Sequence, residues 1–484
     1  MASDNYEAII GLEVHTHLAT RAKLFCGCST AFGAPPNQNI CPVCAGMPGT
    51  LPVLNRGAVE LALRVGLAMS CEIAFESVFA RKSYFYPDLP KGYQITQYEL
   101  PLCRGGRVEL PPDREGRSRT VRLTRIHLEE DAGKNIHTGG ASLVDLNRAG
   151  VPLLEIVSEP DLRTAQEAGA YLRELREILR YTGASDGRME EGSLRCDVNV
   201  SVRPAGSEQY GVKVEIKNLN SFRFVERAIE YEVGRQIEAL AAGATLTQET
   251  RLWDAGRSVT RPMRSKEFAD DYRYFPEPDL PPLVVAPAWV AQVRAKMPEL
   301  PAERRTRFTR ELGLGPYEAG VLTQQRELAD YFEALAAQVT NRRSAANWVM
   351  TEVLRFANES NKPLAEAVSP AVEAAALLRM VEAQQISLNA AKTAFAALCA
   401  GWQKGEHKSA TDLVAELGLA QVSDEAEIAA ACDRLLASES VKVAEYRAGR
   451  DKLFGFFVGQ VMKAMGGRAN PKVVNQVLRR KLQS

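Results

Sequence analysis

The sequence predicts an α+β fold, in which a domain built on a mixed or antiparallel sheet is followed by two all-helical domains. Strand-like segments with period-two alternation outnumber helix-like segments up to about residue 285. Five prolines fall within residues 276–287, and from about residue 288 Ala, Leu, Glu and Gln recur with helical spacing. A polar, glycine-containing break at residues 401–407 divides this helical part. The predicted domains are therefore residues 1–290, 291–405 and 406–484.

The composition is that of a globular protein. The 484 residues include 60 Lys+Arg and 60 Asp+Glu, with 25% charged and 45% hydrophobic residues, which excludes the disordered, fibrous and membrane classes. No apolar run approaches the roughly 20 residues of a membrane span. The residues Met1–Tyr6 lack the basic and apolar regions of a signal peptide. We expect a cytoplasmic protein without a membrane partner.

The first predicted strand, Ile9–Leu18, alternates with period two. Its apolar residues Leu12, Val14 and Leu18 fall on one face, and its polar residues fall on the other: Glu13, His15 and His17. Carboxylate and imidazole groups on one strand face can bind a divalent cation. This strand therefore provides candidate metal ligands.

Two further segments add carboxylates to this candidate site. Glu129 and Glu130 would point to opposite faces of a regular strand, so both serve one site only if the strand ends there, before Gly133. Glu155 lies in the middle of the apolar segment Val151–Val157, and a buried carboxylate needs a cation or hydrogen-bond donors. A metal is one partner for Glu155, and a salt bridge to Arg148 is the alternative.

Two later segments, residues 197–203 and 212–218, also alternate. Their polar faces carry Asp197 and Asn199 in the first segment and Lys213, Glu215 and Lys217 in the second. Lysines beside an acidic metal cluster suit a phosphate carried by a divalent ion, although a solvated sheet face has the same pattern. No Walker-type loop and no strand-linked G-x-G-x-x-G occurs, so these two kinds of nucleotide site are excluded.

Two helices are predicted between these strands. The capping box Thr164–Glu167 starts a helix that runs to about Tyr181, with Gly183 just beyond. A second helix begins near Ser221 and runs to about residue 240.

Four of the nine cysteines form two close pairs, Cys26/Cys28 and Cys41/Cys44. Four thiolates can surround one Zn²⁺ tetrahedrally, which leaves no open position for a reacting water and predicts a structural zinc in an insert at residues 26–44. The alternative is four reduced thiols in a surface loop. The other five cysteines are typical of small buried hydrophobic residues.

Basic residues concentrate near the end of the sequence. Residues 442–484 carry ten Lys or Arg against two acidic residues, a net charge of +8, so the first 441 residues carry −8. Asn470 is the predicted N-cap of a basic helix that starts at Pro471. Clustered basic residues on a small helical domain indicate binding to a phosphate backbone; a solvated basic end without a partner is the alternative.

Several long ungapped motifs carry a resemblance to a known family. They are Ile10–His15, Cys41–Gly49, Lys82–Gln94, His127–Lys134, Val144–Arg148, Met189–Asn199 and Asp271–Asp279. The whole chain resembles the B-subunit family of the aspartyl/glutamyl-tRNA(Asn/Gln) amidotransferases. The resemblance implies a cradle-shaped α+β catalytic domain, a helical domain and a small helical tail that binds the outer corner of tRNA.

The resemblance also implies a mechanism. Members of this family are carbon–nitrogen ligases that use ATP and Mg²⁺ to phosphorylate the side-chain carboxylate of Glu or Asp mischarged onto tRNA, and ammonia then displaces the phosphate. By resemblance the Mg²⁺ ligands and catalytic residues would be Glu13, His15, Glu129, Glu130 and Glu155. Candidates for nucleotide or acceptor-end contacts are Lys82, Asp197, Asn199, Lys213 and Lys217. The four cysteines match the zinc-bearing members, whereas His17 departs from the amide or acid more common in the family.

The resemblance also implies the partners. The chain has no Gly-Gly-Ser-Ser amidase signature, so it should not make its own ammonia, and the resemblance implies an amidase A subunit that supplies ammonia and a small C subunit that completes a heterotrimer. Two other classes stay open from the residues: a non-catalytic tRNA-binding scaffold with structural metals, and a zinc hydrolase, which four cysteine ligands disfavour.

Overall fold

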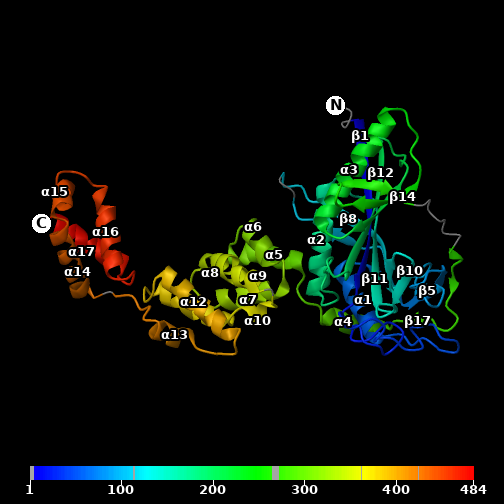
Figure 1. Cartoon of the computed structure of the whole chain (residues 1–484), viewed down its shortest axis with the longest axis horizontal. Coiled ribbons are helices and arrows are strands. Elements are labelled where there is room, and N and C mark those ends of the chain that lie inside the picture. Colours follow the sequence, from blue (N-terminus) through cyan, green and yellow to red (C-terminus); the bar gives the residue numbers. More distant parts are fainter. Residues whose placement is uncertain (1–4, 113–114, 264–271, 361, 423, 484) are drawn as a thin grey trace. The chain divides into compact units, whose positions relative to one another are not determined.

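The structure, a computed structural model, describes residues 5–112, 115–263, 272–360, 362–422 and 424–483. Met1–Asp4, Ser484 and Asp271, the first residue of one motif above, lie outside the described residues. The chain forms two compact units, Met1–Leu300 and Pro301–Ser484. The first unit combines strands with four helices, and the named elements of the second unit are helical within the described residues (Figure 1).

The strands of the first unit are β1 (Tyr6–His17), β2 (Glu72–Ile73), β3 (Glu76–Ser77), β4 (Ala80–Ser83), β5 (Tyr93–Thr96), β6 (Cys103–Arg104), β7 (Arg107–Glu109), β8 (Thr120–Glu130), β9 (Lys134–Thr138), β10 (Ala141–Asp145), β11 (Pro152–Ser158), β12 (Leu194–Pro204), β13 (Val214–Leu219), β14 (Glu249–Asp254), β15 (Val259–Pro262), β16 (Phe275–Pro276) and β17 (Leu283–Val284). Its helices are α1 (Arg56–Ala68), α2 (Ala165–Tyr181), α3 (Phe222–Ala241) and α4 (Pro287–Ala295).

Ten of these strands form one large sheet in the order β15-β14-β13-β12-β1-β11-β8-β6-β2, with β7 also paired to β8. The central strand β1 pairs antiparallel with β12 on one side and with β11 on the other. Among the described strands of this sheet, β13 and β14 make the one parallel pair. The predicted mixed sheet and the α+β class are therefore confirmed.

One face of the sheet is covered by helices and the other carries polar side chains. Ile10, Leu12 and Val14 of β1 lie in a hydrophobic core that also includes side chains of α1, α2 and α3. The two long helices α2 and α3 pack side by side against this face (Figure 1). Because side chains alternate along a strand, Glu13, His15 and His17 point to the opposite face, as the sequence predicts.

The boundaries predicted for two of the helices in this unit, α2 and α3, are also confirmed. Thr164 and Glu167 form both hydrogen bonds of the capping box at the start of α2, and Gly183 follows its end with φ of +68°. The Ser221 side chain accepts a hydrogen bond from the Phe224 amide at the start of α3.

The helices of the second unit are α5 (Pro301–Leu312), α6 (Pro316–Leu322), α7 (Arg326–Ala336), α8 (Arg342–Trp348), a π-helical turn (Val349–Val353), α9 (Leu354–Ser360), α10 (Leu364–Ala367), α11 (Ala371–Glu382), α12 (Leu388–Trp402), α13 (Ala410–Glu416), α14 (Glu425–Ser438), α15 (Ser440–Arg447), α16 (Leu453–Ala464) and α17 (Pro471–Gln483).

These helices enclose two separate hydrophobic clusters. The first cluster draws on α5 to α13 and includes Phe332, Trp348 and Phe395. The second draws on α14 to α17 and includes Phe457 and Leu478. Leu413 and Val414 of α13 belong to the first cluster. The helical character of this part is confirmed, and its division into domains at residue 405 stays a prediction.

Membrane insertion of a helix is not supported by the described residues, because none of their helices is both long enough and apolar enough to serve as a span.

Candidate functional site

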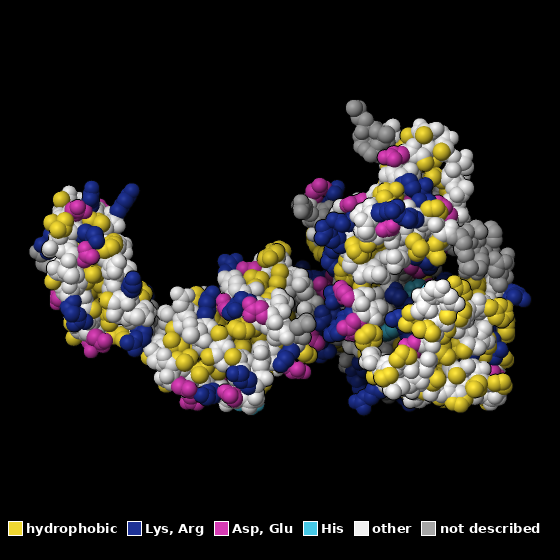
Figure 2. Space-filling view, in the orientation of Figure 1, with side chains coloured by type: hydrophobic (Ala, Val, Ile, Leu, Met, Phe, Trp, Pro, Cys, Tyr) yellow, Lys and Arg dark blue, Asp and Glu magenta, His cyan; other side chains and the backbone are white. Residues whose placement is uncertain are grey.

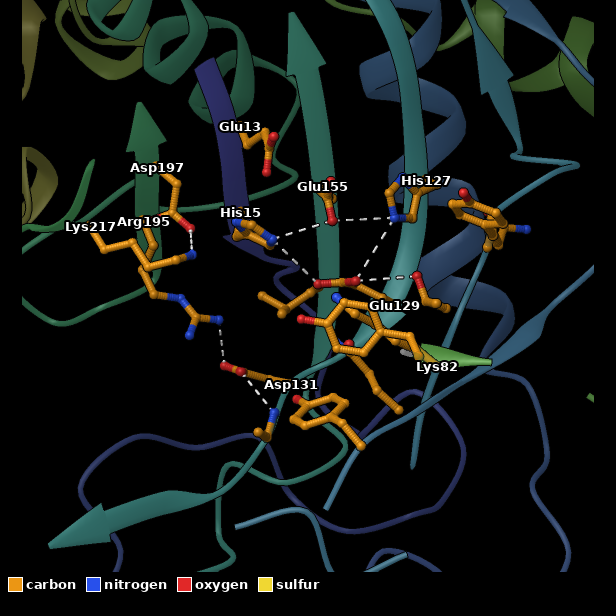
Figure 3. Close-up of a pocket in the computed structure, with 18 of the residues that line it drawn as sticks. Glu13, His15, Lys82, His127, Glu129, Asp131, Glu155, Arg195, Asp197 and Lys217 are labelled. Carbon is orange, nitrogen blue, oxygen red and sulfur yellow. Dashed lines mark hydrogen bonds and ion pairs between the residues drawn. The ribbon is translucent and has the colours of Figure 1, made fainter. Parts of the chain in front are cut away.

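Four strands bring four polar side chains into one row across the polar face of the sheet. His15 on β1 lies opposite Arg195 on β12 and opposite Glu155 on β11. Glu155 in turn lies opposite His127 on β8. Directly opposed residues on antiparallel strands have Cβ atoms about 4.5–5.5 Å apart. The side chains of His15, Glu155 and His127 therefore meet although they are far apart in the sequence, whereas the Arg195 side chain is directed toward Asp131 (Figure 3).

Glu129 completes a cluster with this row. Nε2 of His15 lies 3.3 Å from Oε2 of Glu155 and 3.6 Å from Oε1 of Glu129. Nε2 of His127 lies 3.4 Å from Oε2 of Glu155. One ligand atom each from His15, Glu129 and Glu155 lies within 4.8 Å of the others, so the three residues can hold one metal ion. The structure therefore brings together three of the five predicted magnesium ligands.

The charges of this cluster depend on one another. Burial alone would lower the pKa of His15, but the hydrogen bond to Glu155 and the carboxylates of Glu129 and Asp197 raise it to about 9. The carboxylates of Glu155 and Glu129 also raise the pKa of His127 against the effect of burial. Burial acts to raise the pKa of Glu155, but the two imidazoles hold it well below its usual range. In the metal-free cluster the histidines thus supply the positive charge that the buried carboxylates require.

The cluster opens into a cavity of about 670 Å³ with further charged and aromatic walls. Its cationic lining includes Lys82, Arg125, Arg195 and Lys217. The Lys82 ammonium lies 4.8 Å from the ring centre of Tyr272. Carboxylates at one side and cations around them suit a divalent cation together with an anionic ligand.

Asp131 connects three basic residues beside this cavity. Its Oδ2 lies 2.7 Å from Nε2 of His17, 2.9 Å from Nη2 of Arg195 and 3.3 Å from Nε of Arg148. Burial acts to raise the pKa of Asp131, but Arg195, His17 and Arg148 together lower it. His17 is thus paired with Asp131 outside the metal-ligand cluster, and Arg148 is not the partner of Glu155.

Of the other predicted residues, Glu13, Asp197 and Lys217 line the same cavity as the cluster. Oε1 of Glu13 accepts a hydrogen bond of 2.9 Å from Nδ2 of Asn199. Nζ of Lys217 lies 2.6 Å from Oδ2 of Asp197. Glu13 also borders a second cavity of about 250 Å³, which Asn199 and Lys213 line.

Glu130 lies away from the cluster. β8 continues through Glu130, so its side chain points to the face opposite Glu129. There its carboxylate is paired with Lys91 and accepts a hydrogen bond of 2.9 Å from the Ile95 amide. The structure therefore separates these two neighbouring carboxylates.

The four paired cysteines come together in a loop of the first unit. The sulfur atoms of Cys26, Cys28, Cys41 and Cys44 lie within 4.8 Å of one another. Sγ of Cys44 is 4.0 Å from Sγ of Cys28 and 3.9 Å from Sγ of Cys41, and the Cys41 amide donates to Sγ of Cys44 at 3.2 Å. Four sulfurs at this spacing fit a tetrahedral Zn–S site with bonds of about 2.3 Å.

Sequence reasoning missed His127, Asp131 and Arg195 as site residues. The sequence carried a signal for each of them, because every second residue of a strand lies on the same face. His127 and Asp131 are two positions from the predicted Glu129, and Arg195 is two positions from the predicted Asp197. The signal for the lining tyrosines was weaker, since Tyr272 and Tyr274 lie in an irregular segment.

The basic end of the chain, residues 442–484, includes most of α15, the helices α16 and α17, and the loops between these helices. Asn470 caps α17 as predicted, with its side chain accepting from the Lys472 amide at 3.0 Å. Within the part of the chain that the structure describes, no carboxylate lies within 4.0 Å of the charged groups of Lys463, Arg468 and Lys472. Figure 2 shows Lys and Arg side chains at the surface of this segment.

Comparisons with known proteins cover almost the whole chain. Residues 8–291 match the family described as "GatB/GatE catalytic domain", and residues 330–482 match the family described as "GatB domain". The chain is 56% identical over 483 residues to the aspartyl/glutamyl-tRNA(Asn/Gln) amidotransferase B subunit of Geotalea daltonii, with 99% of each chain covered. Proteins of the same name from Geobacter sulfurreducens and Myxococcus xanthus are 54% and 52% identical, with 99–100% of each chain covered.

Proposed function

Because the chain belongs to the family of aspartyl/glutamyl-tRNA(Asn/Gln) amidotransferase B subunits, we propose that it converts misacylated Glu-tRNA(Gln), Asp-tRNA(Asn) or both into Gln-tRNA(Gln) and Asn-tRNA(Asn). An oxygen of the aminoacyl side-chain carboxylate attacks the γ-phosphorus of ATP, and ADP leaves. Ammonia then attacks the acyl carbon, inorganic phosphate leaves, and the nitrogen loses a proton to give the amide. The chain is thus a carbon–nitrogen ligase subunit with glutamine as the nitrogen donor, and its place in protein synthesis implies a cytoplasmic location.

The observation that carries this proposal is the cluster of His15, Glu129 and Glu155 inside a cavity with a cationic lining. His15, Glu129 and Glu155 would hold Mg²⁺, with Glu13 next to them, and the ion supplies charge neutralisation of the phosphates when bound. Lys82, Arg195 and Lys217 line the same cavity and can orient anionic oxygens. Positioning and charge stabilisation are what phosphoryl transfer requires most from a protein.

The smaller cavity supports a place for the nucleoside end of ATP. Glu13 borders both cavities, and Gly11, two residues before it on the same face of β1, lines the smaller cavity. Oδ1 of Asn199 is buried without a hydrogen-bond partner among the described residues, so a ligand's hydroxyl or amino group would satisfy it. The exposed ring of Tyr210 lines the same cavity and offers a stacking surface. We assign Asn199 and Lys213 to this end of the nucleotide.

The proposed partners supply ammonia and tRNA. The family name denotes one subunit of a complex, and we propose an amidase A subunit and a small C subunit as its companions. Figure 2 shows hydrophobic side chains on the surface of the first unit, as an interaction surface requires. Large hydrophobic residues exposed in this unit include Phe32, Met47, Leu51, Val53, Phe75 and Phe85. The basic residues of α16 and α17 are proposed to bind tRNA phosphates.

The four cysteines are proposed to hold a structural Zn²⁺. The spacing of the sulfurs and the amide hydrogen bond to Cys44 support this assignment. Four protein ligands would fill the coordination sphere, so the ion would stabilise the loop and take no part in the reaction.

The test is tRNA-dependent ATP hydrolysis and amide formation by the complex reconstituted with its A and C subunits. Each misacylated tRNA is supplied in turn. Glu155→Gln keeps the shape of the side chain and removes its charge, so both activities should fall by about 10²- to 10³-fold. The matched control is Glu109→Gln on β7, an exposed carboxylate outside both cavities.

The rival scaffold function predicts a different result. A non-catalytic tRNA-binding scaffold would bind tRNA without consuming ATP, and Glu155→Gln would change nothing. Wild-type activity in folded Glu155→Gln protein would therefore overturn the site assignment, and lack of tRNA-dependent ATP hydrolysis in the wild-type complex would overturn the function.

A further inference from the structure

Lys23 is a fully buried lysine beside the cysteine cluster. Its side chain has 0% exposure. Its Nζ lies 3.4 Å from Sγ of Cys44 and 3.3 Å from the carbonyl oxygen of Leu146. Burial of an ammonium group is costly unless an anion and hydrogen-bond acceptors surround it. The anion that balances Lys23 must therefore be found among these neighbours.

A carboxylate does not fill this role. Across the described ranges of the chain, no carboxylate oxygen lies within 4.0 Å of Nζ of Lys23. Glu130 and Lys23 both line a cavity of about 240 Å³ beside the cysteine loop, but Glu130 is engaged by Lys91 and by the Ile95 amide. The Cys44 sulfur is thus the one group in contact with Lys23, among the described residues, that can carry negative charge.

The backbone around Lys23 is built to hold it there. Its amide donates to the Cys28 carbonyl at 3.0 Å, and its own carbonyl accepts from Nδ2 of Asn55 at 3.2 Å. Gly150 faces the lysine stem with φ of +85°, and a Cβ at Gly150 would lie 3.5 Å from both Cδ of Lys23 and Cβ of Cys44. The lysine is therefore fixed in position between the cysteine loop and the segment that follows the β9–β10 hairpin.

We propose that Lys23 is a positioning residue for the cluster: it donates a charge-assisted hydrogen bond to the metal-bound thiolate of Cys44 and thereby sets the affinity for the ion. The inference rests on the structural zinc proposed above. Four thiolates around one divalent ion leave a net charge of −2, which a buried ammonium partly neutralises. Four protonated thiols would leave Lys23 without an anion, so metal loading and the burial of Lys23 stabilise each other.

The experiment compares the full-length wild-type chain with Lys23→Met, which keeps the length of the side chain and removes the charge. Zn²⁺ affinity is measured by competition with a chromophoric chelator, and Co²⁺ is used to record the thiolate charge-transfer bands. Lys23→Met should bind Zn²⁺ about 10- to 100-fold more weakly, as expected when a group that hydrogen-bonds to a ligand is lost. It should also shift the Co²⁺ bands, because the thiolate loses a hydrogen bond.

Thermal unfolding gives a readout that separates this role from simple packing. With zinc bound, Lys23→Met should unfold at a lower temperature than the wild type. In the metal-free state Lys23→Met should unfold at the same or a higher temperature than the wild type. In that state no metal-bound thiolate balances the buried ammonium of Lys23, so its removal costs no stability. Lower stability in both states would identify a packing role and overturn the inference.

Two comparisons keep the outcome decisive. Lys91→Met is the matched control, because Lys91 lines the same cavity but its ammonium pairs with Glu130 and makes no hydrogen bond to a sulfur among the described residues. The zinc affinity of Lys91→Met should equal that of the wild type. Equal affinity in Lys23→Met and wild type would overturn the role of Lys23 while the zinc site stands. If the wild type took up no zinc, the proposed zinc site would fail and this inference with it.

Discussion

His15 and Glu155 lie directly opposite each other on β1 and β11, with Nε2 of the imidazole 3.3 Å from Oε2 of the carboxylate. Neighbouring strands of an antiparallel sheet hold such a pair at a fixed separation. Glu129 and His127 approach the same point from β8. A preformed group of this kind needs little rearrangement to receive a cation, and the first two predictions follow from it.

Glu129→Gln and Glu130→Gln form a matched pair of variants on one strand. Glu129→Gln should weaken Mn²⁺ binding by more than about tenfold, because loss of a group that only orients a ligand already costs about 10- to 100-fold. Glu130→Gln should leave the affinity close to that of the wild type, because its carboxylate faces Lys91 on the other side of the sheet. Electron paramagnetic resonance of free Mn²⁺ measures both. Equal losses would show that both carboxylates reach one ion.

Divalent-cation binding should depend on pH through His15. The pKa of His15 in the metal-free protein is about 9, above its ordinary value of about 6.5, so at neutral pH the imidazole is protonated. A cation binds Nε2 only after that proton leaves. Apparent affinity should therefore rise by up to about tenfold per pH unit as the pH approaches 9. Calorimetric titrations between about pH 7 and 9 measure this slope, and His15→Asn should flatten it; a flat wild-type profile would exclude His15 as a ligand.

Asn199→Ala should raise the KM for ATP by about five- to tenfold with little change in kcat. This corresponds to the loss of a hydrogen bond of about 1 kcal/mol to the nucleoside end. Steady-state kinetics of the reconstituted complex at saturating tRNA give both constants. The comparison variant is Asn135→Ala on β9, which lines neither cavity. An unchanged KM for ATP in Asn199→Ala would place the nucleoside elsewhere.

Removal of the chain after Ala420 should raise the KM for tRNA by at least about tenfold and leave kcat at saturating tRNA close to the wild-type value. This boundary keeps Leu413 and Val414 in their hydrophobic cluster, whereas a cut at residue 405 would remove them. Substitution of Lys463, Arg468 and Lys472 by Gln in the full chain tests the charge effect without truncation. It should weaken tRNA binding and reduce its salt dependence. Unchanged tRNA affinity in both proteins would contradict the proposed role of the tail.

The parts of the fold that local chemistry determines could be predicted from the sequence. The capping box at Thr164 and Glu167 fixes the start of α2 because both of its hydrogen bonds form within four residues. The alternation from Leu12 to His17 determines which side chains face the core and which face the cavity. Both signals lie within a short stretch of chain and need no partner strand.

The site as a whole could be predicted only in part, because it depends on which strands become neighbours. The order β12-β1-β11-β8 places Arg195, His15, Glu155 and His127 in one row, and no local pattern specifies that order. The sequence also did not specify where β8 ends. If the strand had ended before Glu130, that side chain could have turned toward Glu129, but β8 continues through Glu130. Lys23 was not predicted beside Cys44 for a different reason: the two residues are 21 positions apart in an irregular segment, where no periodic pattern indicates which side chains meet.

The row across four strands has a consequence for how the chain folds. Its members come from residues 15, 127, 155 and 195, so no hairpin or single strand pair contains the complete set. Contacts of such wide sequence separation form late, because long loops must close first. The proposed ion ligands His15, Glu129 and Glu155 lie on β1, β8 and β11. Uptake of Mn²⁺ during refolding should therefore coincide with the pairing of these three strands and lag behind the formation of α2 and α3, which makes the ion a kinetic reporter of sheet assembly.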